Sequence, residues 1–80
     1  MNNVFYESTQ RVKALDYISK EHQLMLYGLY KQATVGDCSI FRPSLFNPRD
    51  RAKWDAWNKK RGMLPDAAKA EYVQYVNNIE

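Results

Sequence analysis

Apolar side chains recur at the three- and four-residue spacing of an amphipathic helix in four stretches of the chain. The first helix is expected over residues 3–16, with one face formed by Phe5, Ser8, Thr9, Val12 and Leu15. The second is expected to begin after Ser19, a favourable N-cap residue, and to end near Thr34. Its apolar residues are too dense for one stripe, so we expect this helix to pack on two sides or to offer one side to a ligand.

The third helix is expected to begin at Pro48, because proline is favoured at the first helical position, with Asn47 as its N-cap. Residues 59–61 are all basic and are expected at its C-terminal end, before Gly62. The fourth helix is expected over residues 65–79. No stretch has the alternation of a strand. The pattern therefore predicts an all-α bundle, with residues 1–80 forming one domain.

The connection between the second and third expected helices is long for so small a domain. Pro43 and Pro48 favour extended or turn geometry in the residues that precede them. The segment also carries Phe41, Leu45 and Phe46, which are too apolar for a flexible linker. We therefore expect this loop to fold back on the core.

Composition and charge narrow the class of protein. Of 80 residues, 45% are apolar and 26% are charged, which is typical of a globular domain. The sequence contains no signal peptide and no run long enough to span a bilayer, and Cys38 is the only cysteine, so we expect a cytoplasmic monomer. The net charge of +3 favours an anionic partner. Because its basic residues are interspersed with acidic ones, a phosphorylated small molecule fits better than nucleic acid.

Residues suited to catalysis or metal binding are scarce. His22 is the only histidine, and Cys38 has no histidine near it in sequence. No cluster of histidine and cysteine has the spacing of a metal site. We therefore expect no enzyme, no metal and no cofactor.

One helical face does carry candidate binding chemistry. Tyr27, Tyr30 and Lys31 lie at positions i, i+3 and i+4. Phenol rings beside an ammonium suit a nucleotide, because a ring stacks on the base and the cation meets a phosphate. Ordinary packing of tyrosines would produce the same pattern, and Trp54 and Trp57 are most simply interpreted as core residues, with Lys53 at their rim.

These residues belong to an ordered set of segments. The set consists of YGLYKQATVGD at residues 27–37, Arg42-Pro43, RAKWDAW at residues 51–57, and Tyr72. In order and spacing it resembles the acyl-CoA-binding protein family, and the resemblance covers the chain from Phe5 to Val76. It implies a skewed up-down-down-up four-helix bundle that binds medium- to long-chain acyl-CoA one to one, as an intracellular carrier in fatty acid metabolism.

The resemblance also implies roles for individual residues. Tyr30 would stack on adenine, Lys31 and Lys53 would bind the 3′-phosphate, and Tyr27 would donate a hydrogen bond near it. The further ligand contacts that it implies are Lys13, Gly28, Leu29 and Tyr72. For the acyl groove it suggests Thr9, Val12 and Leu24.

Other interpretations of the function stay open. The chain departs from the family pattern in the loop of residues 38–48, where Ser44 follows the proline and Phe41 is unusual. It could also be a helical lipid-sensing or protein-interaction module excised from a larger protein. Basic residues 59–61, together with Arg49 and Arg51, suit a transient membrane contact. A transient contact with an acyl-CoA-using enzyme is a further partner to consider.

Overall fold

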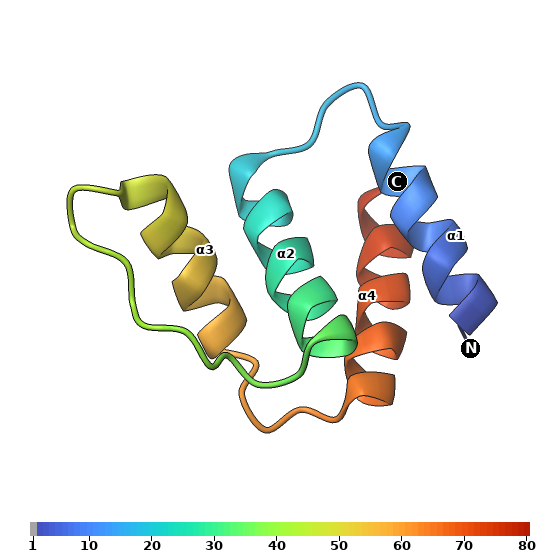
Figure 1. The fold of residues 1–80 in the computed structure, drawn as a ribbon. Coiled ribbons are helices and arrows are strands. Elements are labelled where there is room, and N and C mark those ends of the chain that lie inside the picture. The colour runs from blue at the N-terminus through green and yellow to red at the C-terminus, as the bar shows by residue number, and fades with distance from the viewer. Residues whose placement is uncertain (1) are drawn as a thin grey trace.

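The computed structural model describes residues 2–80, so Met1 lies outside the described part of the chain. It forms four helices, α1 (Asn2–Lys13), α2 (Lys20–Thr34), α3 (Pro48–Asn58) and α4 (Pro65–Ile79), and residues 2–80 contain no strand. Helices α1 and α4 run in one direction and α2 and α3 in the other (Figure 1). The predicted all-α, up-down-down-up bundle is therefore confirmed.

The core lies between α1, α2 and α4. Its buried residues are Phe5, Leu26, Leu29, Ala33, Ala68, Tyr72 and Val76. Helix α2 packs against α4 on one side and against α3 on the other, whereas α1 packs against α4. The high apolar density of α2 is explained by these two packed sides. Helix α3 contributes one buried side chain, Trp57, whose Nε1 donates to the Gly36 carbonyl oxygen at 2.7 Å.

Several helix ends follow from local chemistry. The Ser19 hydroxyl accepts a hydrogen bond from the His22 amide at 3.2 Å, which confirms the N-cap of α2. Gly36 and Gly62 have φ angles of 101° and 91°, a region that glycine enters without steric penalty. Asn47 occupies the N-cap position of α3, but its side chain makes no capping hydrogen bond.

Two helices are shorter than predicted. Helix α1 ends at Lys13 rather than near residue 16, and α3 ends at Asn58, so residues 59–61 do not continue it. Instead, the Lys60 and Arg61 amides donate to carbonyl oxygens three residues back, which tightens the chain into a turn. The Arg61 guanidinium also donates to the Cys38 carbonyl oxygen at 2.6 Å, so it holds the preceding loop in place.

The loop between α2 and α3 does not fold back on the core, and that expectation was wrong. Phe41 and Phe46 are 98% and 97% exposed, and Leu45 is 73% exposed. The loop is held by other contacts: Cys38 is buried, and the Trp54 indole donates to the Ile40 carbonyl oxygen at 2.8 Å. Its length has a topological cause, since α2 and α3 are parallel neighbours and the chain must travel back along them (Figure 1).

A set of hydrogen bonds joins the C-terminal end of α2 to the segment that precedes α4. Asp37 Oδ1 accepts hydrogen bonds from Gln32 Nε2 and from the Gly62 amide, each at 2.8 Å. Gln32 Nε2 also donates to the Met63 carbonyl oxygen at 2.8 Å. These bonds, above all the one from Gly62, lower the pKa of Asp37 from its ordinary value because they favour the ionised form.

Acid should therefore destabilise the fold partly through Asp37. A carboxyl with a lowered folded-state pKa contributes stability above its ordinary pKa, and that stability is lost as the pH falls through the folded value. We expect the free energy of unfolding, measured by urea denaturation, to decrease below about pH 4. The decrease should be smaller in Asp37→Asn, which keeps an accepting oxygen but cannot titrate. Identical pH profiles for both proteins would contradict this role; Asp55 and Glu80, whose pKa values are also lowered, account for a residual slope.

Candidate functional site

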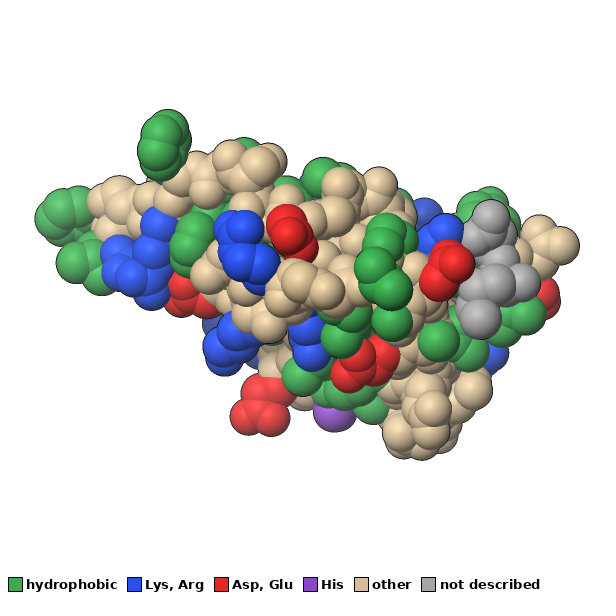
Figure 2. All heavy atoms as spheres, turned by 90° about the horizontal axis from the view of Figure 1, so that it is seen from below, with side chains coloured by type: hydrophobic (Ala, Val, Ile, Leu, Met, Phe, Trp, Pro, Cys, Tyr) green, Lys and Arg blue, Asp and Glu red, His purple; other side chains and the backbone are tan. Residues whose placement is uncertain are grey.

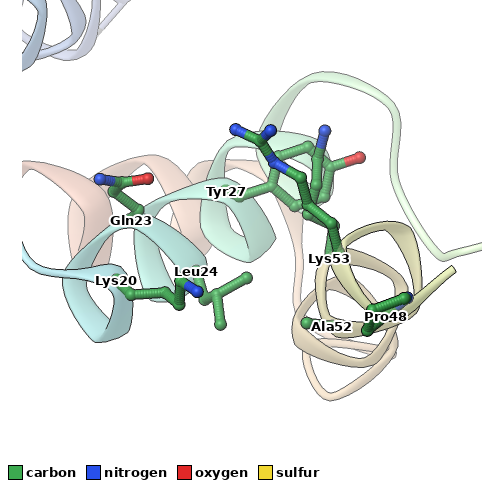
Figure 3. Close-up of a pocket in the computed structure, with 8 residues that line it drawn as sticks. Lys20, Gln23, Leu24, Tyr27, Pro48, Ala52 and Lys53 are labelled. Atoms are coloured by element: carbon green, nitrogen blue, oxygen red, sulfur yellow. The ribbon is translucent and has the colours of Figure 1, made fainter.

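Two adjoining cavities lie between the parallel helices α2 and α3, and together we call them the α2–α3 groove. The larger has a volume of about 580 Å³ and is lined by Lys20, Gln23, Leu24, Tyr27, Pro48, Arg49, Ala52 and Lys53. The smaller, of about 380 Å³, is lined by Glu21, Leu24, Met25, Ala52, Asp55, Ala56, Lys59 and Lys60. Leu24 and Ala52 line both cavities, and Figure 3 shows Leu24 pointing from α2 into the space beside α3.

The close approach of the two helices depends on Gly28. A Cβ atom added at this position would lie 2.4 Å from the Ala56 carbonyl oxygen and 2.9 Å from its carbonyl carbon. Such distances are shorter than van der Waals contact, and both atoms belong to the backbone of α3. Gly28, expected as a ligand contact, is therefore a packing residue that sets the spacing of the helices beside the groove.

Two ammonium groups lie above aromatic rings at this site. Lys53 Nζ is 4.9 Å from the centre of the Tyr27 ring, and Lys31 Nζ is 5.0 Å from that of Trp57. Figure 3 shows the Lys53 side chain reaching from α3 toward Tyr27 on α2. The ion pairs found within residues 2–80 are Arg11–Glu80, Arg42–Asp55 and Lys60–Glu71. Neither Lys31 nor Lys53 is neutralised by these pairs, so both can meet an anion.

Tyr30 lines neither cavity and is supported by two further rings, one from α1 and one from α4. It is 43% exposed, and its ring is stacked on Phe5 with centroids 6.1 Å apart. Tyr72 is buried, 6.5 Å from the Tyr30 ring and 5.1 Å from that of Phe5. Side chains from α1 and α4 therefore fix the orientation of Tyr30, whose exposed part can stack on a flat ligand.

The phenol groups of Tyr27 and Tyr72 both have a pKa raised from its ordinary value. Burial is the main cause that raises the pKa of each, with a smaller contribution from Cys38 and Asp50 for Tyr27 and from Tyr30 for Tyr72. At neutral pH both hydroxyls are protonated, as that of an ordinary tyrosine already is, and the raised pKa extends this state to more alkaline pH. This suits Tyr27 to an anionic ligand, because Tyr27 lines the groove.

The structure separates several expected site residues from the groove. Thr9, Val12 and Lys13 are on α1, which packs against α4 and lines neither cavity. Thr9 is buried and donates to the Tyr6 carbonyl oxygen at 2.6 Å, and Val12 packs against the core. Leu29 has no exposed surface, so its side chain belongs to the core and has none to offer a ligand.

Other lining residues were not found from the sequence. Lys20, Gln23, Pro48, Arg49 and Ala52 line the larger cavity, but none of them had been singled out as a contact for acyl-CoA. Polar and small residues on exposed helix faces have no distinctive periodicity. These residues could have been identified only from the packing of α2 against α3, which the tertiary structure shows and the sequence does not.

The residues most often used in catalysis are engaged elsewhere. His22 Nδ1 is 2.7 Å from the Tyr75 hydroxyl, and Cys38 is buried. No group of three or more His, Cys, Asp and Glu side chains in the described residues is arranged to hold a metal ion. Within the same residues, every helix is too short or too polar to cross a bilayer.

Comparison with known proteins identifies the family. The sequence pattern of the family described as "Acyl CoA binding protein" matches residues 2–76. The chain belongs to the acyl-CoA-binding protein family. This confirms the family indicated by residues 27–37, and it is a family of binding proteins rather than enzymes.

Individual relatives agree with this assignment. The chain is 47% identical over 77 residues to "Acyl-CoA-binding domain-containing protein 3" of Oryza sativa subsp. japonica, which covers 95% of this chain and 50% of the relative. It thus spans about half the length of that relative. It is 45% identical to the "Acyl-CoA-binding protein" of Ricinus communis, over 94% of this chain and 84% of the relative.

A solved structure confirms the fold. The crystal structure of Oryza sativa acyl-CoA-binding protein 2 superposes with a TM-score of 0.92 at 46% identity. The superposition covers 96% of this chain and 85% of that chain. The arrangement of the four helices is therefore that of the acyl-CoA-binding protein family.

Proposed function

We propose that this chain binds medium- to long-chain fatty-acyl-CoA esters one to one and acts as an intracellular carrier that also maintains an acyl-CoA pool. The observation that carries the proposal is the position of two cations outside the ion pairs of residues 2–80: Lys53 lines the α2–α3 groove and lies over Tyr27, and Lys31 of α2 lies over Trp57 of α3. An acyl-CoA ester has a phosphorylated nucleotide at one end and an apolar chain at the other. The site has matching chemistry for both.

The cations and rings account for the nucleotide end. A phosphomonoester carries about −1.5 to −2 charges at neutral pH, so two ammonium groups are its natural complement. The Tyr27 hydroxyl supplies a neutral hydrogen-bond donor near Lys53, while Tyr30 stacks on adenine and Tyr72 holds Tyr30 from behind. A stacked base contributes about 1–3 kcal/mol to binding.

The groove accounts for the acyl chain. Its smaller cavity contains the apolar side chains Leu24, Met25, Ala52 and Ala56, with charged side chains at its margin. Each methylene group that leaves water contributes about 0.8 kcal/mol. Leu24 was expected in this role, and the structure adds Met25 and the two alanines from α3 as candidates. Binding should therefore tighten with chain length.

The test is calorimetric titration with palmitoyl-CoA, free CoA and palmitate in the same buffer. We expect one molecule of palmitoyl-CoA to bind per chain, at least 100-fold more tightly than either fragment, since the fragments lose either the apolar or the ionic contacts. Equal affinity for the ester and for free CoA would show that the groove does not bury the chain. Absence of ester binding would reject the proposal.

A second candidate follows from the relative of twice the length. The same domain could serve as a lipid-sensing or protein-interaction module within a larger protein. Tyr30→Ala distinguishes the two functions. A carrier loses acyl-CoA affinity in this variant, whereas an interaction module keeps its protein partner.

A further inference from the structure

An exposed apolar cluster lies at the end of the molecule opposite α1. Its members are Phe41, Leu45 and Phe46, which we call the loop cluster, and all belong to the connection between α2 and α3. Exposure of two phenylalanine side chains over 97% and 98% of their surface is unusual for a small globular domain. Figure 2 shows hydrophobic side chains projecting from the left end of the molecule, which is formed by this loop and α3.

The loop that carries this cluster is held in shape by hydrogen bonds. The Trp54 indole and the Arg61 guanidinium donate to the carbonyl oxygens of Ile40 and Cys38, at 2.8 and 2.6 Å. The Arg42 guanidinium donates two hydrogen bonds to the Asp55 carboxylate, each at 3.1 Å. These contacts fix the backbone without using the apolar side chains. The loop cluster therefore makes no contribution to the core that would explain its composition.

Positive charge is concentrated in the same part of the chain. Residues 42–61 contain seven Lys and Arg and two Asp, a net charge of +5, although the whole chain has only +3. Asp55 offsets the charge of Arg42, and Asp50 lies between Arg49 and Arg51 on α3. Figure 2 shows a group of Lys and Arg side chains next to the projecting hydrophobic ones.

We propose that the loop cluster and the arginines of α3 form a docking surface for an anionic lipid membrane. The phenylalanine and leucine side chains would enter the boundary between head groups and acyl chains, and Arg49 and Arg51 would meet anionic head groups. The described helices do not span a bilayer, so the contact would be peripheral. A second copy of the chain fits this surface less well, because a symmetric contact would bring the two positive segments together.

The position of this surface has a consequence for the groove. Pro48, Arg49 and Lys53 line the larger cavity, and the first two lie within three residues of Phe46 in sequence. Docking would thus place one wall of the α2–α3 groove next to the lipid surface. The docking itself involves the ligand-free protein, so it can be tested separately from acyl-CoA binding.

The experiment is sedimentation of the ligand-free protein with lipid vesicles. One set contains phosphatidylcholine alone, and the other contains about one third phosphatidylserine. We expect binding to the anionic vesicles, a loss of that binding by at least about tenfold in the double variant Phe41→Ser/Phe46→Ser, and a weakening with added salt. Arg51→Gln should also weaken binding. Tyr17→Ser, which removes an aromatic ring that is 81% exposed elsewhere, is the matched control and should bind as the wild type does.

Folding is checked by thermal denaturation. We expect the double variant and the wild type to have the same midpoint, because both substituted side chains are exposed. Three results would overturn the proposal. The first is no binding of wild type to anionic vesicles, and the second is equal binding by the double variant. The third is a wild type that does not bind vesicles but self-associates as its concentration rises, as seen by ultracentrifugation. If the double variant lost this self-association, the surface would be assigned to a second copy of the chain.

Discussion

Replacing Gly28 with alanine is expected to destabilise the protein by about 1–3 kcal/mol, the usual effect of overpacking. The new Cβ would lie 2.4 Å from the Ala56 carbonyl oxygen, so α3 would have to move away from α2. Because α3 packs mainly against α2, that movement would also distort the α2–α3 groove. We expect a lower urea midpoint together with weaker binding of palmitoyl-CoA.

The sign of the stability change in Gly28→Ala distinguishes packing from helix propensity. In an unconstrained helix, glycine to alanine stabilises by about 1 kcal/mol. The reverse substitution Ala70→Gly, at an exposed position inside α4, measures that intrinsic term in the same protein. If Gly28→Ala proved as stabilising as Ala70→Gly is destabilising, helix propensity alone would explain both, and the close approach of α2 and α3 would not constrain position 28.

Removing either Lys31 or Lys53 is expected to weaken binding of palmitoyl-CoA by about 10- to 150-fold. This range corresponds to the 1.5–3 kcal/mol of a hydrogen bond to a charged group. Both lysine side chains are partly exposed and each lies over the face of an aromatic ring, so Lys31→Ala and Lys53→Ala should retain the fold. Isothermal titration calorimetry measures the affinities, and thermal denaturation checks the fold.

A ligand without the 3′-phosphate supplies the control for this prediction. If the two lysines bind that phosphate, palmitoyl-dephospho-CoA should bind both variants and the wild type with nearly equal affinity. Lys13→Ala provides a comparison on the protein side, and we expect little change because Lys13 is on α1, which packs against α4 rather than against α3. Should the lysine variants lose as much affinity for the dephospho ligand, the lysines would act on another part of the molecule.

Much of the fold follows from local sequence. The spacing of apolar residues predicted the four helices, because a helical turn repeats about every 3.6 residues whatever the rest of the chain does. Ser19 began α2 as expected, and Gly36 and Gly62 have the positive φ angles that such ends require. Two predicted helix ends were wrong: α1, expected from apolar spacing to reach residue 16, ends at Lys13, and α3, expected from its basic residues to reach residue 61, ends at Asn58. After Asn58 the chain tightens into a turn, and Arg61 donates to the Cys38 carbonyl oxygen, a contact between distant segments that the sequence does not show.

The candidate site could be predicted only in part. Tyr27, Tyr30 and Lys31 share a face of α2, which the sequence indicates through their spacing alone. That Lys53 lies over Tyr27 could not be read in the same way, because it depends on the parallel packing of α3 beside α2. For the same reason, the expectation of an acyl groove at Thr9 and Val12 has no support from the cavities, which lie on the other side of α2.

By itself, the sequence determined the four helices, the N-cap of α2 and the family, because those depend on neighbouring residues or on an ordered pattern along the chain. The tertiary structure decided which faces meet. It gave Gly28 its role as the contact point with Ala56, brought cations from two helices to one groove, and left Phe41 and Phe46 exposed. The physical reason is that packing between segments distant in sequence depends on the shape of both partners, and hydrophobic spacing along one segment records only its own half of the contact.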